Sequence, residues 1–171
     1  MPIKSRPLLE YWLRNMENIG VNGVLVNTHY YSEYVSDFLQ NSCFNNNVCV
    51  AYENELLGTA GTIRKNSDFY KDDTLLLVHA DNWSCCNYSD FLNYHYNCRP
   101  KDTLITMMTF TCENPLSCGI VELDNEGIVT SFHEKVDFPP GNLANAAVYL
   151  LDPIVIDWIK KNTNISDFSP E

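Results

Sequence analysis

The chain has few basic residues and no segment in which they gather. Its 171 residues include 11 Lys and Arg against 22 Asp and Glu, which gives a formal net charge of -11. Surfaces that bind nucleic acid or anionic membranes neutralise phosphates with clustered cations. The composition therefore argues against both kinds of partner. A phosphate bound here must be met by one or two placed cations, by backbone N–H groups or by a metal.

Long apolar runs are also missing, and none approaches the roughly 20 residues of a membrane helix. The first residues lack the apolar core of a secretory signal. We therefore expect no membrane partner and a cytoplasmic protein. The seven cysteines form no Cys-x-x-Cys pair and no zinc-finger spacing with histidine, so we expect unpaired thiols in a reducing compartment.

The chain does contain alternating strand and helix patterns up to about residue 110. Apolar periodicity predicts helices over 8–18, 32–40, 61–66, 89–97 and 153–161, and strands over 24–26, 48–52, 75–78, 103–111 and 146–151. Ser32 and Ser89 are candidate N-caps. Residues 120–124 and 128–132, joined through Asn-Glu-Gly, predict a hairpin. This order predicts one compact domain with a mostly parallel α/β sheet and an inserted antiparallel hairpin.

The apolar run Leu75–Val78 ends shortly before Asp81 and Asn82. Four consecutive large apolar residues predict a strand buried on both faces, whose carboxyl end delivers Asp81 to a crevice. A single carboxylate there suits Mg²⁺, which takes oxygen ligands and keeps waters and substrate phosphates as its other partners. The alternative is an ordinary turn or helix cap.

Three further segments could carry chemistry. The small, glycine-flanked run Gly58–Gly61 lets a ligand approach the backbone, with a helix N-terminus behind it, or is a plain strand-to-helix turn. Glu134 and Lys135 offer a hydroxyl acceptor beside a cation for phosphate, or form a solvated ion pair. Asn145 could bind a hydroxyl or cap a turn. The four histidines lack a triad partner in sequence, and we expect structural roles for His29, His79, His95 and His133, with His79, two residues before Asp81, as the first candidate for an exception.

In this order the motifs resemble those of the sugar-1-phosphate nucleotidyltransferases, over nearly the whole chain. The likeness is greatest to the mannose-1-phosphate and heptose-1-phosphate guanylyltransferase branch. It rests on residues 6–12 (RPLLEYW), 57–61 (LGTAG), 132–135 (FHEK) and 139–145 (PPGNLAN).

The resemblance implies a Rossmann-like sheet of the nucleotide-diphospho-sugar transferase type, with helices on both faces. It also implies a reaction in which a hexose- or heptose-1-phosphate attacks a nucleoside triphosphate, GTP being favoured, and pyrophosphate leaves. The site roles that it implies are Mg²⁺ binding and catalysis for Asp81; nucleotide binding for Glu53, Gly58, Thr59, Ala60 and Asn82; sugar-phosphate binding for Gly119, Glu134 and Asn145; and both catalysis and sugar-phosphate binding for Lys135.

The chain departs from the family pattern at several places. It lacks the glycine-rich loop with its Pro-Lys pair and the second metal-binding Asp, and it has Ala80 and Ala147 where many relatives have glycine. We therefore expect a single domain over 1–171 that is incomplete at both ends, lacks the first strand and turns over little substrate.

Two other functions remain open from the sequence. One is a noncatalytic sugar-nucleotide-binding or regulatory module of the same fold. The other is a glycosyltransferase that uses a preformed nucleotide sugar, but such enzymes usually show an Asp-x-Asp pattern, and here Asn82 and Trp83 follow Asp81. The base, the sugar and the formation of a homo-oligomer stay open as well.

Overall fold

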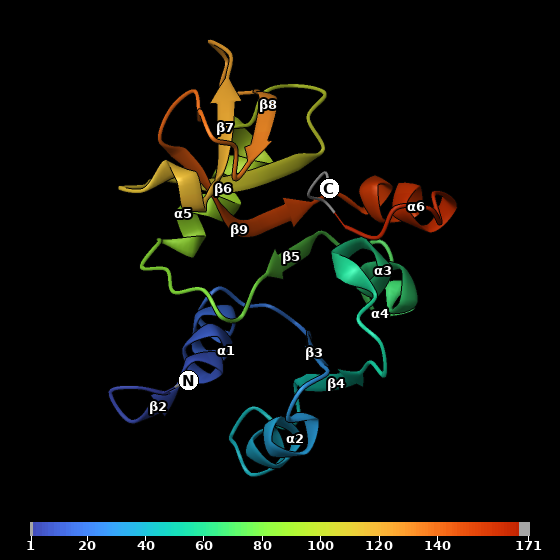
Figure 1. Ribbon diagram of the computed structural model, residues 1–171. Helices are drawn as coiled ribbons and strands as arrows, with labels where there is room; N and C mark the ends of the chain where they lie inside the picture. The colour runs from blue at the N-terminus through green and yellow to red at the C-terminus, as the bar shows by residue number, and fades with distance from the viewer. Residues whose placement is uncertain (1, 168–171) are drawn as a thin grey trace. The chain divides into compact units, whose positions relative to one another are not determined.

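The computed structural model describes residues 2–167, which form two compact units. Unit 1 comprises residues 2–71 and 158–167, and unit 2 comprises residues 72–157. Each unit has strands and helices of its own (Figure 1). The single domain expected from the sequence stays a prediction.

Unit 1 contains a short hairpin, a two-stranded parallel sheet and helices. Its elements are β1 (Pro2–Ile3), β2 (Arg6–Pro7), α1 (Leu8–Asn18), β3 (Val24–Thr28), α2 (Ser32–Gln40), β4 (Val48–Tyr52), α3 (Gly58–Lys65) and α4 (Ser67–Tyr70). The helices α1 and α2 and the strand β4 have the predicted bounds, and β3 continues two residues beyond its prediction.

The core of unit 1 lies where α1 and α2 meet the parallel pair of β3 and β4. Leu13, Leu39 and Phe44 are buried there, and Val24 and Val48, which are partners in the sheet register, pack against them. Apolar residues at helical spacing put Leu13 on the inner face of α1 and Leu39 on the inner face of α2, and Phe44 follows α2 in a turn. The periodicity in the sequence thus located this core.

Two helices begin differently from the prediction. Ser32 does not cap α2, because Tyr31 precedes the helix with a left-handed backbone (φ 52°), and its carbonyl accepts a hydrogen bond from Val35 N. Ser89 does not cap α5 (Tyr88–Asn93) either, because the side chain of Asn87 accepts a hydrogen bond from Ser89 N at 3.1 Å. Asn and Ser are equally good N-caps, so their preference alone did not distinguish these two positions.

Unit 2 contains a five-stranded sheet. After α5 come the π-helical turn η1 (Tyr94–Cys98) and the 3-10 turn η2 (Pro115–Ser117), and the strands are β5 (Leu75–Val78), β6 (Ile105–Thr111), β7 (Gly119–Leu123), β8 (Val129–Glu134) and β9 (Leu143–Leu151). Strands β5, β6 and β7 all pair antiparallel with β9, and β8 pairs antiparallel with β7, as in the predicted hairpin (Figure 1). Helix α6 (Pro153–Lys161), which has the predicted bounds, continues from unit 2 into unit 1.

The mixed α/β fold class is confirmed, with a parallel pair in unit 1 and antiparallel pairs in unit 2. Antiparallel pairing extends beyond the predicted hairpin to β5 and β6, because an apolar run does not state the direction of its neighbour. The prediction that Leu75–Val78 is buried on both faces is wrong. All four residues are half-buried, and β9 is the one strand that pairs with β5 among residues 2–167.

Among the helices of residues 2–167, none combines the length and the apolar character needed to cross a membrane.

Candidate functional site

Asp81 follows the carboxyl end of β5, as the sequence predicted, and lies in an exposed turn, which was the alternative to the predicted crevice. Asn82 closes this turn by donating its backbone N–H to the carbonyl of His79 at 3.1 Å. The side chain of Asn82 donates to the carbonyl of Ala146 in β9, also at 3.1 Å, and His79 N donates to the carbonyl of Ala147. The turn is therefore tied to β9, and the Asp81 carboxylate faces solvent.

A kink in β9 lies beside this turn. Ala147 has a left-handed backbone (φ 54°), and its N–H donates to Asn145 Oδ1 at 2.9 Å. The amide nitrogen of Asn145 donates to the hydroxyl of Tyr149 at 2.6 Å. Asn145, expected to face the sugar, thus uses both ends of its amide to hold the kink. The left-handed backbone also explains why glycine would suit position 147.

The sugar-phosphate residues predicted on β7 and β8 are neighbours in the sheet. Gly119 pairs with Glu134, and a Cβ at position 119 would lie 2.6 Å from Phe132 Cζ and 2.7 Å from Glu134 Oε2. Only glycine fits there without displacing these side chains. Lys135 follows β8 with a positive φ of 47°, its Nζ lies 3.5 Å from Glu134 Oε1, and 66% of its side chain is exposed. The lysine charge is therefore available to a ligand.

The predicted glycine loop is the first turn of a helix. Helix α3 begins at Gly58, three residues before the predicted start at Gly61, and Gly58 has a φ of 71°. The carbonyl of Ser166 accepts hydrogen bonds from Ala60 N at 3.0 Å and Gly61 N at 3.3 Å. A Cβ at Gly58 would lie 2.3 Å from the same carbonyl oxygen. Small residues are needed in this turn because another backbone segment packs against it.

Glu53 is buried, with 1% of its surface exposed, and its carboxylate organises the same part of unit 1. Oε1 accepts a hydrogen bond from the hydroxyl of Thr62 at 2.8 Å, and Oε2 accepts one from Leu57 N at 3.4 Å. Burial, assisted by the charge of Glu53, raises the pKa of Tyr70 to about 12. Glu53 thus fastens the loop before α3 to the helix. Its partners, Thr62 and Leu57, were not recognised from the sequence because no motif marks them.

In unit 2, the Asp81 carboxylate could serve as a single protein ligand of Mg²⁺. Within residues 2–167, no three His, Cys, Asp or Glu side chains come together as a metal cluster. Mg²⁺ commonly uses one or two carboxylates and takes its remaining ligands from phosphates and water. The exposed Asp81 carboxylate suits that use. The magnesium assignment, like the ligand roles of the other site residues, stays a prediction.

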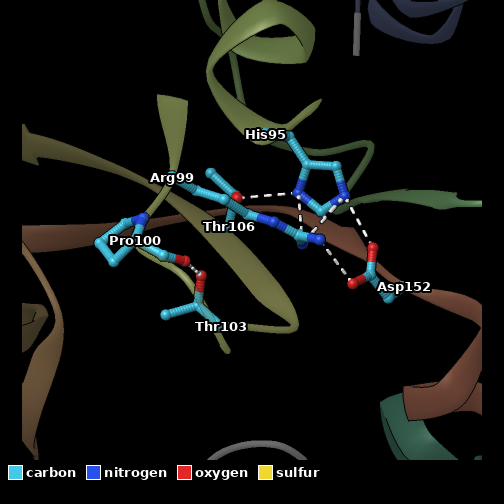
Figure 2. Close-up of polar contacts among 6 residues, drawn as sticks. All are labelled: His95, Arg99, Pro100, Thr103, Thr106 and Asp152. Carbon is cyan, nitrogen blue, oxygen red and sulfur yellow. Dashed lines mark hydrogen bonds and ion pairs between the residues drawn. The ribbon is translucent and has the colours of Figure 1, made fainter. Parts of the chain in front are cut away.

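His95 is fully buried within a polar cluster, shown in Figure 2, whose members Arg99 and Asp152 are partly exposed. Its Nδ1 lies 2.8 Å from Thr106 Oγ1 and its Nε2 lies 3.1 Å from Asp152 Oδ1. Arg99 donates to Asp152 Oδ2 at 2.7 Å, and its Nη1 lies 3.3 Å from both ring nitrogens. Burial, and then the charge of Arg99, lower the pKa of His95. A neutral imidazole thus connects η1, β6 and the start of α6, which supports the structural role expected for this histidine.

Comparison with known proteins places these motifs in one family. The model of the family described as nucleotidyl transferase matches residues 1–170. The chain belongs to the nucleotidyl transferase family.

Two named relatives of the chain share about a quarter of their aligned residues with it. The chain is 27% identical over 167 residues to the bifunctional protein GlmU of Methanocaldococcus jannaschii, covering 98% of this chain and 37% of that protein. It is 26% identical over 167 residues to the mannose-1-phosphate guanylyltransferase of Mycobacterium tuberculosis, covering 97% of this chain and 46% of that protein. The chain therefore spans less than half of the length of these two relatives.

A solved structure shares the fold. HddC from Yersinia pseudotuberculosis aligns with a TM-score of 0.79 at 22% identity, covering 99% of this chain and 71% of HddC. At this identity the likeness concerns the fold alone.

Proposed function

We propose that this nucleotidyl transferase chain carries out sugar-1-phosphate nucleotidyl transfer, forming a nucleoside diphosphate sugar and pyrophosphate. The observation that carries the proposal is the pairing, within the sheet of unit 2, of Gly119 with Glu134, which is followed by the exposed cation of Lys135. Such a combination suits a ligand with hydroxyl groups at one end and a phosphate at the other.

The reaction needs positioning and charge neutralisation more than covalent help from the protein. An oxygen of the sugar-1-phosphate attacks the α-phosphorus of the nucleoside triphosphate, and the bond from that phosphorus to the pyrophosphate oxygen breaks. Lys135 would hold the sugar phosphate, and Glu134 would accept hydrogen bonds from sugar hydroxyls. Asp81 would hold Mg²⁺, which when bound neutralises phosphate charge.

We favour GTP with a mannose- or heptose-type sugar-1-phosphate. The relatives support this choice, because several are named mannose-1-phosphate guanylyltransferases. A structure of HddC is described as complexed with GMP-PN. Another relative is named a UTP-glucose-1-phosphate uridylyltransferase, so the test includes other bases. A nucleotide sugar made here would serve glycan biosynthesis, as the name of one relative from Haloferax volcanii says of that protein.

The second candidate is a noncatalytic sugar-nucleotide-binding module. One observation favours it: the N–H groups of Ala60 and Gly61, at the turn expected to read the nucleotide, already donate to the Ser166 carbonyl. A triphosphate that used this turn would have to replace those hydrogen bonds.

One experiment separates the two candidates. The chain is incubated with Mg²⁺, with each nucleoside triphosphate in turn and with mannose- or heptose-1-phosphate. The pyrophosphate and the sugar nucleotide that form are then quantified. Binding of the substrates and of the sugar nucleotide is measured separately by calorimetry. Equimolar pyrophosphate and GDP-sugar, at rates of ~1–1000 per second in an ordinary enzyme, would establish the transfer. Binding of the sugar nucleotide without turnover would establish the module, and neither binding nor turnover would exclude both.

A matched pair of lysines tests the assigned site. Lys135→Ala should weaken sugar-1-phosphate binding at least tenfold, because it removes the exposed cation beside Glu134. Lys101→Ala removes another exposed lysine of unit 2 and should leave binding unchanged. Equal binding by both variants would contradict the assignment.

A further inference from the structure

The seven cysteines are free thiols in two different settings. Five are exposed, namely Cys43, Cys49, Cys85, Cys86 and Cys98. Cys112 is buried, and Cys118 is half-buried and packs against the cluster of Cys112, Ile120 and Ala144. These two cysteines are therefore held close to each other by the core of unit 2.

The chain path explains why they meet. Ala144 of β9 pairs with Phe110 of β6 on one side and with Ile120 of β7 on the other. The segment 112–118 joins β6 to β7, so it crosses from one side of β9 to the other. Cys112 is anchored at its start by donating its N–H to the carbonyl of Asn142 at 2.9 Å.

The end of the segment is fixed as well. The turn η2 brings the chain back, with Cys118 N donating to the carbonyl of Pro115 at 3.2 Å. The side chain of Cys118 then packs against the cluster that contains Cys112. Since both ends of the short segment are held by the sheet and the turn, this proximity is built into the fold.

The two thiols differ in access. Cys118 is half-buried, whereas only 7% of Cys112 is exposed, so Cys118 is the more accessible residue of the two. Burial, and then the neighbouring Cys118, raise the pKa of the Cys112 thiol. A buried thiol of raised pKa is a poor first nucleophile, so Cys118 would react first and Cys112 second.

We propose that Cys112 and Cys118 form an oxidisable dithiol site, which a low-molecular-weight disulfide such as oxidised glutathione converts into an intramolecular disulfide. The Cys118 thiolate attacks one sulfur of the reagent, which releases one reduced thiol and leaves a mixed disulfide. The Cys112 thiolate then attacks the Cys118 sulfur and releases the second reduced thiol. The protein loses two electrons and two protons, and the reagent gains both.

Oxidation of the dithiol should affect the neighbouring sheet residues and the thermal stability of the protein. Cys118 directly precedes Gly119, which is crowded by Phe132 and Glu134. A covalent bond at Cys118 would therefore restrict the backbone that leads into Gly119. A disulfide that closes a short loop restricts the unfolded chain and so stabilises the folded protein. The oxidised protein should therefore melt about 5 °C higher than the reduced protein, and a reductant should reverse the shift.

Mass spectrometry tests the proposal directly. Trypsin releases residues 102–135 as one peptide that contains Cys112 and Cys118 and no other cysteine. The native chain is equilibrated with oxidised glutathione, and its remaining thiols are blocked with N-ethylmaleimide before digestion. The proposal predicts that this peptide loses the mass of two hydrogen atoms and takes up no maleimide. A peptide that stays reduced, or that carries only glutathione, would overturn it.

Single variants provide the matched controls. Cys118→Ser and Cys112→Ala each remove one partner and should abolish both the mass loss and the reversible thermal shift. Cys85→Ser removes an exposed thiol of the same unit and should leave both intact. Cys112 is buried, so the Cys112→Ala variant could fail to fold. Cys118 is partly exposed, so the Cys118→Ser variant still tests the proposal in that case. A mass loss that survives in Cys118→Ser would also contradict the pairing.

Discussion

The predicted nucleotide residues of unit 1 and the predicted sugar-phosphate and metal residues of unit 2 differ in what their polar groups already bind. In unit 1, Glu53 is buried against Thr62 and Leu57, and the N–H groups of Ala60 and Gly61 donate to a carbonyl. In unit 2, Asp81 is exposed and Lys135 presents its charge to solvent. The groups of unit 1 are satisfied by the protein, whereas Asp81 and Lys135 of unit 2 are open to a ligand.

The difference follows from desolvation. A buried carboxylate is tolerated only with hydrogen-bond partners, so Glu53 must be fastened to its surroundings and shapes them. An exposed carboxylate or ammonium stays hydrated and therefore has no desolvation penalty, and it can exchange its bound water for a metal or a phosphate. Motifs in a family pattern therefore mark two kinds of residue, those that shape the site and those that bind.

The largest expected effect is on Asp81. Asp81→Asn removes the exposed charge while keeping the size of the side chain, so turnover should fall about 100- to 1,000-fold with unfolding free energy unchanged within ~0.5 kcal/mol. Pyrophosphate release and the magnesium dependence of nucleotide binding measure the effect. Asp137→Asn, another exposed carboxylate of unit 2, is the control. If both variants behaved alike, the assignment of Asp81 as a carboxylate that binds a ligand would be wrong.

Glu53 should show the opposite behaviour. Glu53→Ala leaves the Thr62 hydroxyl and Leu57 N–H without their partner, so the free energy of unfolding should fall by about 2 kcal/mol. Urea unfolding measures this loss. Glu55→Ala, at an exposed position two residues away, should cost less than ~0.5 kcal/mol. A Glu53→Ala variant of full stability that loses only nucleotide binding would move Glu53 to the binding class.

His95 extends the comparison to a buried group of unit 2. It faces Arg99, Asp152 and the ring of Tyr96, and its pKa is lowered in the folded protein, chiefly by burial. The unfolded chain therefore binds more protons than the folded chain below about pH 6.5. Stability should be complete above that pH and should decline as the pH falls towards the folded pKa, by at most about 1.4 kcal/mol per pH unit from this group.

Urea unfolding at a series of pH values measures this slope. His95→Gln should flatten it, because the titrating group is removed. His133→Gln, which changes a partly exposed histidine paired with Glu122, should retain it. A slope that persists in His95→Gln would assign the pH dependence to other groups.

The sequence predicted most elements and the order of the site motifs, because apolar periodicity and motif spacing depend on local residues. It did not predict that β5 pairs antiparallel with β9, because strand direction depends on distant residues. For Asn145 it left sugar binding and turn capping open, and the amide is seen to hold the backbone of Ala147, while the sugar role stays a prediction. The sequence also did not predict the contact of the Ser166 carbonyl with α3. This contact joins backbone atoms about 100 positions apart, so no side-chain pattern marks it.

Ala147 is expected to show the smallest effect, because its substitution changes only local backbone strain beside the exposed turn of Asp81. A non-glycine residue at a φ of 54° carries about 1 kcal/mol of backbone strain, which the hydrogen bond from Ala147 N to Asn145 Oδ1 helps to hold. Ala147→Gly should therefore raise the free energy of unfolding by up to ~1 kcal/mol. Ala80→Gly alters a turn residue without a positive φ, so it should lower stability by a few tenths of a kcal/mol because the unfolded chain gains freedom. Thermal or urea unfolding of both variants measures the contrast, and a gain at both positions would show that the kink in β9 is not the source.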